Sequence, residues 1–185
     1  MSSRRPLPYD PRWPVLFEEE AAVLRETLAP WVVGDVHHVG STSIRGMAAK
    51  PVIDMIAGVR DLEGARDAFE PLGRLGYGRV EHRKDAHAFH KPPDAPTQWE
   101  HTHHLHLTVP GSDLWRERLA FRDALRGDPC LVREYTEWKL AQYGRPTSPP
   151  ASKRPFVARV LAAQGVVLKP DEERLTEAAL ARRRS

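Results

Sequence analysis

The sequence predicts an α/β (α+β) fold in which helices pack on one face of a small mixed β-sheet and the C-terminal half is helical. Three observations lead to this prediction. In the first 110 residues, short β-branched and apolar runs typical of strands alternate with longer amphipathic windows. Beyond that point, only windows of helical periodicity remain. The length of 185 residues, with 41% hydrophobic and 29% charged residues, suits one domain with a buried core.

The N-terminal elements follow from local composition. Residues 1–11 are expected to form an extended arm, because their three prolines oppose a helix. Residues 12–28 place apolar side chains at helical spacing and predict the first helix. The β-branched run 31–39 predicts a strand, and the apolar run from Val52 to Ile56 predicts a second one.

The rest of the chain is divided by glycine and proline. Further strands are expected at 79–83, 86–91 and 101–109, and further helices at 61–72, 114–125, 131–143 and 155–164. Proline-rich loops are expected at 92–97 and 145–151. The single domain is therefore predicted to span residues 12–165. The charged residues 166–185 have no obvious apolar face and are expected to form a loosely held basic tail.

The most informative stretch runs from His38 to Asp54. A strand ends there in Gly40, Ser41 and Thr42, and a second apolar run then carries Asp54. Glycine and small turns let backbone N–H groups approach an anion, so this turn is expected to bind a phosphate. Asp54 is the only acid in its apolar run, and burial of an unpaired carboxylate is costly. We therefore expect Asp54 to face a lysine, an arginine or a metal ion.

Four of the nine histidines lie in the short run 101–106. Strand alternation places His104 and His106 on one face, about 6 to 7 Å apart, and the intervening leucines on the core face. If this strand lies beside the Asp54 strand, then Asp54, His104 and His106 could bind a divalent metal such as Zn²⁺ or Mn²⁺ and act in catalysis. Mg²⁺ prefers oxygen ligands and suits the set less well. The alternative is that the two imidazoles only form hydrogen bonds in a polar cleft or contact a phosphate.

Six further side chains are candidates near this cleft. Lys50 precedes the Asp54 strand and could contact a phosphate, pair with a carboxylate or remain exposed. Arg122 offers a planar fork for phosphate, although pairing with a neighbouring acid is an equal alternative. Tyr135 and Lys139 lie one turn apart on the next helix, and His38 precedes the turn, so these three are secondary candidates. Trp99 is a further candidate as a platform for base stacking.

Three segments carry a family resemblance. They are Tyr9 to Glu20, His38 to Asp54, and Thr102 to Leu107 followed by Phe121-Arg-Asp123, and they span nearly the whole chain. Together they resemble the GrpB family of small bacterial proteins, which looks like a branch of the nucleotidyltransferase superfamily. The resemblance implies a nucleotidyltransferase-like fold that binds a nucleotide or other phosphorylated ligand. It also implies metal-assisted nucleotidyl or phosphoryl transfer or hydrolysis as the class of reaction.

The chain departs from that superfamily pattern at two positions. The usual second carboxylate would stand two residues after Asp54, where this chain has Ile56. Arg45 stands where the turn of the family usually has proline. Two-metal phosphoryl transfer relies on several carboxylates, so a non-catalytic ligand-binding or accessory module is the alternative function. GrpB-like domains also occur fused to dephospho-CoA kinase, which associates the family with nucleotide or coenzyme A chemistry.

Composition restricts the partners and the compartment. Cys130 is the only cysteine, so an intramolecular disulfide is excluded and a reducing compartment is expected. The N-terminus lacks a signal-like apolar region and no run reaches about 18 apolar residues, so the prediction is a cytoplasmic protein without a membrane partner. The net charge of +3 suits an anionic small molecule or nucleic acid, and a solvated basic surface is the alternative explanation. The expected partner is a phosphorylated small molecule or nucleotide. RNA binding through the basic tail is a third hypothesis.

Overall fold

The structure, a computed structural model, describes residues 5–97, 100–142 and 152–184. Its elements in chain order are α1 (Trp13–Leu28), β1 (Val32–Val39), the 3₁₀ helix η1 (Ser41–Ser43), β2 (Ile53–Val59), the 3₁₀ helix η2 (Gly64–Ala68), α2 (Phe69–Arg74), β3 (Gly78–Val80), β4 (Ala86–Lys91), β5 (His103–Thr108), α3 (Asp113–Gly127), α4 (Pro129–Gln142), α5 (Arg154–Ala163), α6 (Asp171–Arg174) and α7 (Glu177–Arg184). Trp99 and the loop expected at 145–151 lie outside the described residues.

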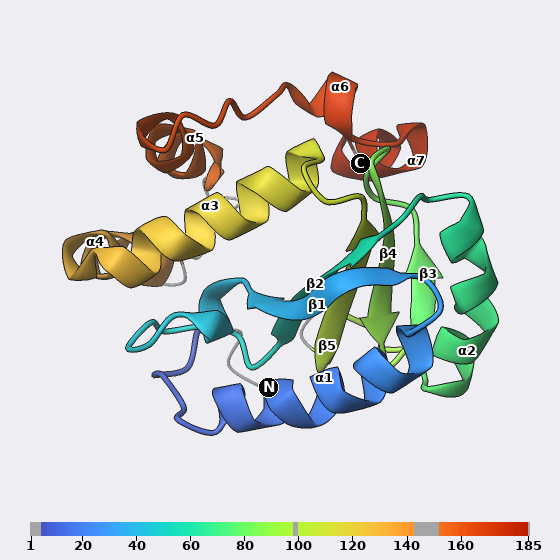
Figure 1. The fold of residues 1–185 in the computed structure, drawn as a ribbon. Coiled ribbons are helices and arrows are strands. Elements are labelled where there is room, and N and C mark those ends of the chain that lie inside the picture. The colour runs from blue at the N-terminus through green and yellow to red at the C-terminus, as the bar shows by residue number, and fades with distance from the viewer. Residues whose placement is uncertain (1–4, 98–99, 143–151, 185) are drawn as a thin grey trace.

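Five strands form one mixed sheet in the order β1-β2-β5-β4-β3 (Figure 1). β2 and β5 are parallel, whereas the other neighbouring strands are antiparallel. Parallel strands need a crossover connection, and the segment containing α2, β3 and β4 provides it. As a result, the strand that carries Asp54 and the strand rich in histidine lie side by side at the centre of the sheet.

One face of the sheet holds the main hydrophobic core. Helix α1 packs there through Trp13, Phe17 and Leu24, and the segment η2–α2 covers the same face. Leu105 and Leu107 of β5 are fully buried in this core, as strand alternation predicts. Figure 1 shows α1 along this face and α3 on the opposite side of the sheet.

The C-terminal helices cover part of the second face. Leu114 of α3 packs against Val39 and Ile56, which belong to neighbouring strands. Helices α3, α4 and α5 enclose another cluster, which also includes Ile44 and Met47 from the connector after β1. The predicted fold class is confirmed, because a small mixed sheet is followed by a helical C-terminal half. The helices lie on both faces of the sheet, however, and not on one face as predicted.

The prediction of one continuous helix at 61–72 is wrong. The chain forms the 3₁₀ helix η2 and only then the short α2. The N-cap position is Glu63 and not the predicted Asp61, but the Asp61 carboxylate does accept a hydrogen bond from the Gly64 backbone N–H at 2.6 Å. Gly64 and Gly73 have low helix propensity, which is consistent with a shorter α-helix.

The C-terminal segment from residue 166 onward, which was predicted to be a loosely held tail, packs against the rest of the domain. Leu175 and Ala179 are buried, and the Thr176 backbone N–H donates to the His82 carbonyl at 3.2 Å. The Lys84 backbone N–H donates to the Arg174 carbonyl at 3.0 Å. The prediction failed because the few apolar residues of this segment lie among many charges and give no clear periodic signal.

A buried ion pair lies beneath the same segment. The Arg83 guanidinium is 3% exposed and donates to Glu117 at 2.7 Å and to Asp85 at 2.8 Å. It therefore joins the β3–β4 connection to helix α3. None of the helices in the described residues combines the length and the apolar character needed to cross a membrane.

Candidate functional site

A row of polar side chains crosses three adjacent strands. Asp54 of β2 is in register with His104 of β5, and His104 is in register with His90 of β4. Register partners point to the same face of a sheet, so the three side chains form one line. The Nδ1 atom of His104 lies 2.9 Å from Oδ1 of Asp54. The structure thus brings together the carboxylate and one of the two imidazoles named from the sequence.

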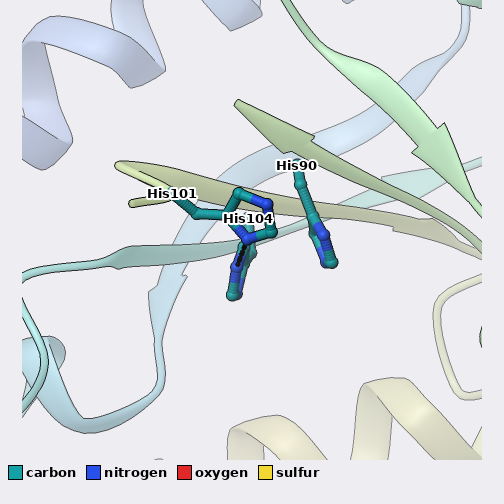
Figure 2. Close-up of side chains that lie close together, drawn as sticks. All are labelled: His90, His101 and His104. Atoms are coloured by element: carbon teal, nitrogen blue, oxygen red, sulfur yellow. Dashed lines mark hydrogen bonds between the residues drawn. The ribbon is translucent and has the colours of Figure 1, made fainter. Parts of the chain in front are cut away.

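Two further histidines, which sequence reasoning missed, adjoin His104. The Nδ1 atom of His101 lies 3.1 Å from Nε2 of His104, and the ring of His90 lies 4.2 Å from that of His104 between centroids. Figure 2 shows the three imidazoles gathered at the sheet surface. One nitrogen from each of His90, His101 and His104 falls within a group whose members are all within 4.8 Å of one another. The available signal was a second histidine-containing strand, 86–91, followed by a loop that returns to the histidine run.

His106 does not join this group, which corrects the predicted metal set of Asp54, His104 and His106. Its register partner on β2 is Ile56, so no carboxylate stands opposite it. The ring is buried, and its nearest aromatic neighbour is His82 at 5.9 Å between centroids. Burial lowers the pKa of His106 well below its usual value and keeps the imidazole neutral. Its Nδ1 atom has no hydrogen-bond partner within residues 5–97, 100–142 and 152–184.

The electrostatic environment keeps Asp54 ionised. Burial alone would raise the pKa of Asp54, but the hydrogen bond with His104 and the charges of His104 and Arg118 lower it to about 2. By contrast, burial lowers the pKa of His90 to about 3, with smaller contributions from His104 and His101. At neutral pH the row therefore has an ionised carboxylate, Asp54, at one end and a neutral imidazole, His90, at the other.

Gly40 is fixed at the turn by the approach of Asp54. Its φ of 69° lies in the left-handed region, which favours glycine. A Cβ atom at this position would lie 2.2 Å from Oδ2 of Asp54. The turn and the carboxylate are therefore in direct contact, as expected for two parts of one site.

Thr42 and His38 lie behind the turn and do not form its open surface. Thr42 is buried, and its hydroxyl donates to the Val52 carbonyl at 2.9 Å. Nε2 of His38 lies 3.0 Å from the same hydroxyl, and its ring stacks on Phe17 of α1 at 4.7 Å. Both side chains, which were predicted to contact a ligand, thus support the turn from the core side.

Lys139 reaches the turn from α4. Its Nζ atom donates to Oγ of Ser41 at 3.0 Å and to the Ala48 carbonyl at 2.7 Å. The same atom lies 4.7 Å from the ring centroid of Tyr135. Burial and the neighbouring charge of Lys153 lower the pKa of Lys139 to about 7. The secondary candidates Lys139 and Tyr135 therefore do lie beside the predicted phosphate-binding turn.

A pocket of about 80 Å³ opens between the turn and α3. Its polar lining consists of Gly40, Ser41, Asp54, Arg118, Arg122, Tyr135 and Lys153. A second pocket of about 180 Å³ shares Arg118, Phe121, Tyr135 and Lys153 with it, so the two cavities adjoin. The lining of the first pocket has several cations and only one carboxylate.

Arg122 and Lys50 differ in how they relate to this pocket. Arg122 lines it, but its guanidinium also pairs with Asp123 at 2.7 Å and donates to the His38 carbonyl at 3.3 Å. Lys50 is half-buried and does not belong to the lining. Burial lowers the pKa of Lys50, whereas the negative charge of Asp54 raises it.

Arg118 is the pocket cation that sequence reasoning missed. It lines both cavities, and its charge contributes to the lowered pKa of Asp54. Within the described part of the chain, no hydrogen bond or ion pair engages its guanidinium. The signal in the sequence was its spacing, because Leu114, Arg118 and Arg122 recur at intervals of four on one face of α3.

Comparison with known proteins gives a consistent family match. The family model described as GrpB protein matches residues 7–162. The glutamate-rich protein GrpB of Alkalihalophilus pseudofirmus is 34% identical over 130 residues, which cover 69% of this chain and 74% of the relative. The UPF0157 protein YqkA of Bacillus subtilis is 35% identical over 140 residues, covering 71% of this chain but only 37% of that longer relative. A dephospho-CoA kinase of Mycolicibacterium paratuberculosis is 31% identical over 153 residues, again covering 37% of the relative.

Two of the solved structures that resemble the chain are informative. The conserved protein GrpB from Enterococcus faecalis matches with a TM-score of 0.74 and 28% identity, covering 85% of this chain and 94% of that one. Cid1 in complex with its short product ApU matches with a TM-score of 0.55 and 15% identity, covering 88% and 52% respectively. At that identity the second match concerns the fold alone, and the fold is nucleotidyltransferase-like.

Proposed function

The chain belongs to the GrpB family, and from this premise we propose that it binds a phosphorylated ligand, a nucleotide in particular, in the pocket between the Gly40–Ser41 turn and α3. The phosphate would lie against the turn and Arg118, and the remainder of the ligand would extend into the adjoining cavity of about 180 Å³. Such a position is in keeping with anion binding by glycine-containing turns.

Arg118 is the observation on which this proposal depends. A guanidinium that lines a cavity and has no protein acceptor in the described residues retains its full capacity for a bidentate bond with phosphate. Lys153 lines the same cavity, and Lys139 donates to the hydroxyl of Ser41 in the turn. The negative charge of Asp54 opposes anion binding, but its carboxylate is hydrogen-bonded to His104.

The choice of nucleotide as ligand class has two supports. The fold is nucleotidyltransferase-like, and the neighbour Cid1 was solved with its product ApU. One relative bears the name dephospho-CoA kinase, although this chain covers only 37% of it. Adenine nucleotides and dephospho-coenzyme A are therefore the first ligands to test.

Metal-assisted transfer or hydrolysis at a phosphate is the second candidate function, and the ionised Asp54 at the pocket favours it. The residues do not fit the usual pair of Mg²⁺ ions, however. Ile56 is fully buried at the position of the second carboxylate, and Asp54 is the only acid of the pocket lining. We derive no transfer step through such a pair, and a ligand-binding module without catalysis agrees equally with this feature.

Calorimetric titration of the purified chain with ATP, AMP, dephospho-coenzyme A and inorganic phosphate tests the proposal. Arg118→Gln is expected to weaken the binding of the best ligand at least tenfold, because a hydrogen bond to a charged group contributes about 1.5 to 3 kcal/mol. Arg116→Gln is the matched control, since Arg116 lies on the same helix with its side chain 60% exposed. Equal affinity of the two variants, or no binding of any of these ligands, would refute the proposal. Binding of an RNA oligomer that survives Arg118→Gln and falls steeply with salt would favour the RNA hypothesis instead.

A further inference from the structure

We propose that His90, His101 and His104 form a binding site for one transition-metal ion of the Zn²⁺ class, in which Asp54 orients His104. The site uses residues other than the phosphate-binding cations, and metal binding does not require the proposed function to be correct. It replaces the predicted set of Asp54, His104 and His106, of which the structure brings only Asp54 and His104 into contact.

The spacing of the nitrogen atoms suits a single ion. One nitrogen from each ring lies within 4.8 Å of the other two, and Nδ1 of His101 lies 3.1 Å from Nε2 of His104. Two nitrogens bound to one tetrahedral Zn²⁺ at about 2.0 to 2.1 Å are roughly 3.3 Å apart. His101 and His104 are thus already near ligand spacing, and His90 would have to move its nitrogen closer by at most about 1.5 Å.

The hydrogen bond with Asp54 assigns the tautomer of His104. An ionised carboxylate accepts hydrogen bonds but does not donate them, so Nδ1 of His104 carries the proton directed at Oδ1. The lone pair of Nε2 is then directed away from Asp54, toward His101. A carboxylate that holds the far nitrogen of a ligating histidine is the usual outer partner in protein zinc sites.

The three ligands come from separately positioned parts of the chain. His90 and His104 occupy adjacent strands in fixed register, and His101 belongs to the segment that enters β5. His90 and His101 also face each other, with ring centroids 4.4 Å apart (Figure 2). The sheet therefore preorganises two ligands, and the entering segment provides the third.

The donor set selects the class of metal. Three imidazole nitrogens suit Zn²⁺, Co²⁺, Ni²⁺ or Cu²⁺, whereas Mg²⁺ requires oxygen ligands. Three protein ligands leave a tetrahedral ion one position for water or for a ligand atom, which is the pattern of catalytic rather than structural zinc sites. Asp54 contacts His104 and also lines the phosphate pocket, so the two sites adjoin.

The competing explanation is a chain of hydrogen bonds without metal. In that arrangement His101 donates from Nδ1 to Nε2 of His104, and His104 donates to Asp54. This chain needs neither His90 nor a metal ion. The two explanations therefore differ in whether His90 matters for metal affinity.

The test uses the full chain without an affinity tag and Co²⁺ as a spectroscopic probe, with no nucleotide present. The expected result is one equivalent of bound Co²⁺, with visible absorption of tetrahedral intensity that Zn²⁺ removes and Mg²⁺ does not. His90→Ala and His101→Ala are each expected to lower Co²⁺ affinity at least tenfold, and Asp54→Asn to lower it about 10- to 100-fold. His37→Gln is the matched control, because His37 lies on β1, where its ring packs against Trp115.

The Co²⁺ titration decides whether His90, His101 and His104 form a metal site. Absence of stoichiometric Co²⁺ binding, or affinity that is unchanged in both His90→Ala and His101→Ala, overturns the site. If His90→Ala fails to fold, as circular dichroism would show, His101→Ala still decides, because His101 lies outside the strands. Since no nucleotide is present, a failure here is distinct from a failure of the proposed phosphate pocket.

Discussion

Replacement of Gly40 by alanine tests the contact between the turn and Asp54. The new Cβ would lie 2.2 Å from Oδ2 of Asp54, whereas ordinary contacts begin at 3.4 Å, so the carboxylate must move by about 1 Å. Such a movement disrupts the 2.9 Å bond with His104, a charged hydrogen bond that contributes about 1.5 to 3 kcal/mol. The Gly40 backbone, with φ 69° and ψ −173°, lies in a region essentially restricted to glycine, which adds about 1 to 3 kcal/mol for any residue with a Cβ.

Gly34→Ala is the matched control for this experiment. Gly34 also has a left-handed φ, of 87°, but a Cβ there would meet no atom within 4 Å. Urea denaturation of both variants should therefore show that Gly40→Ala loses at least about 1.5 kcal/mol more unfolding free energy than Gly34→Ala. In an Asp54→Gly background this excess should vanish, because the obstructing side chain is gone. Equal losses in the two single variants would show that the turn and Asp54 are not in the contact described.

Three other predictions concern stability. Burial lowers the pKa of His38 to about 4, so between pH 4 and 6.5 the unfolded chain binds a proton that the folded chain does not, and the unfolding free energy rises with pH. His38→Gln should reduce this slope by up to about 1.4 kcal/mol per pH unit in urea titrations at several pH values. A slope that does not change would contradict the burial of His38 as its cause. Leu175→Ala should lower the unfolding free energy by about 2 to 5 kcal/mol and therefore lower the urea midpoint. Val167→Ala should have little effect on the midpoint, because Val167 is 80% exposed. Similar midpoints for the two variants would mean that the C-terminal segment is not docked. Arg83→Met should lower the unfolding free energy by about 3 to 5 kcal/mol, because it leaves Glu117 buried without its partner. Adding Glu117→Leu should recover most of that loss. A double variant as unstable as Arg83→Met would show that Arg83 and Glu117 do not form a buried ion pair.

Local pattern in the sequence is sufficient for most of the fold. Period-two alternation predicts that Leu105 and Leu107 face the core, and the structure agrees. Helix α1, expected at 12–28, spans Trp13–Leu28. Local pattern does not predict the docking of the C-terminal segment, because its buried apolar side chains, Leu175 and Ala179, lie among charged neighbours.

The candidate site was less accessible to prediction, because it depends on contacts between distant parts of the chain. Alternation identified His104, but only the pairing of β4 with β5 places His90 opposite it. Likewise, only the packing of α3 over the sheet brings Arg118 to Asp54. Pairing order and helix placement are tertiary properties, and a single sequence contains no direct signal for either one.

The line from Asp54 through His104 to His90 also limits how the gene can change over evolutionary time. Side chains alternate along a strand, so inserting or deleting one codon in β5 ahead of His104 would turn every later side chain of that strand to the opposite face. Codon changes of the same size in the surface connections would leave the line intact. Descendants of this gene are therefore expected to vary in length between the strands and to conserve length within β2, β4 and β5.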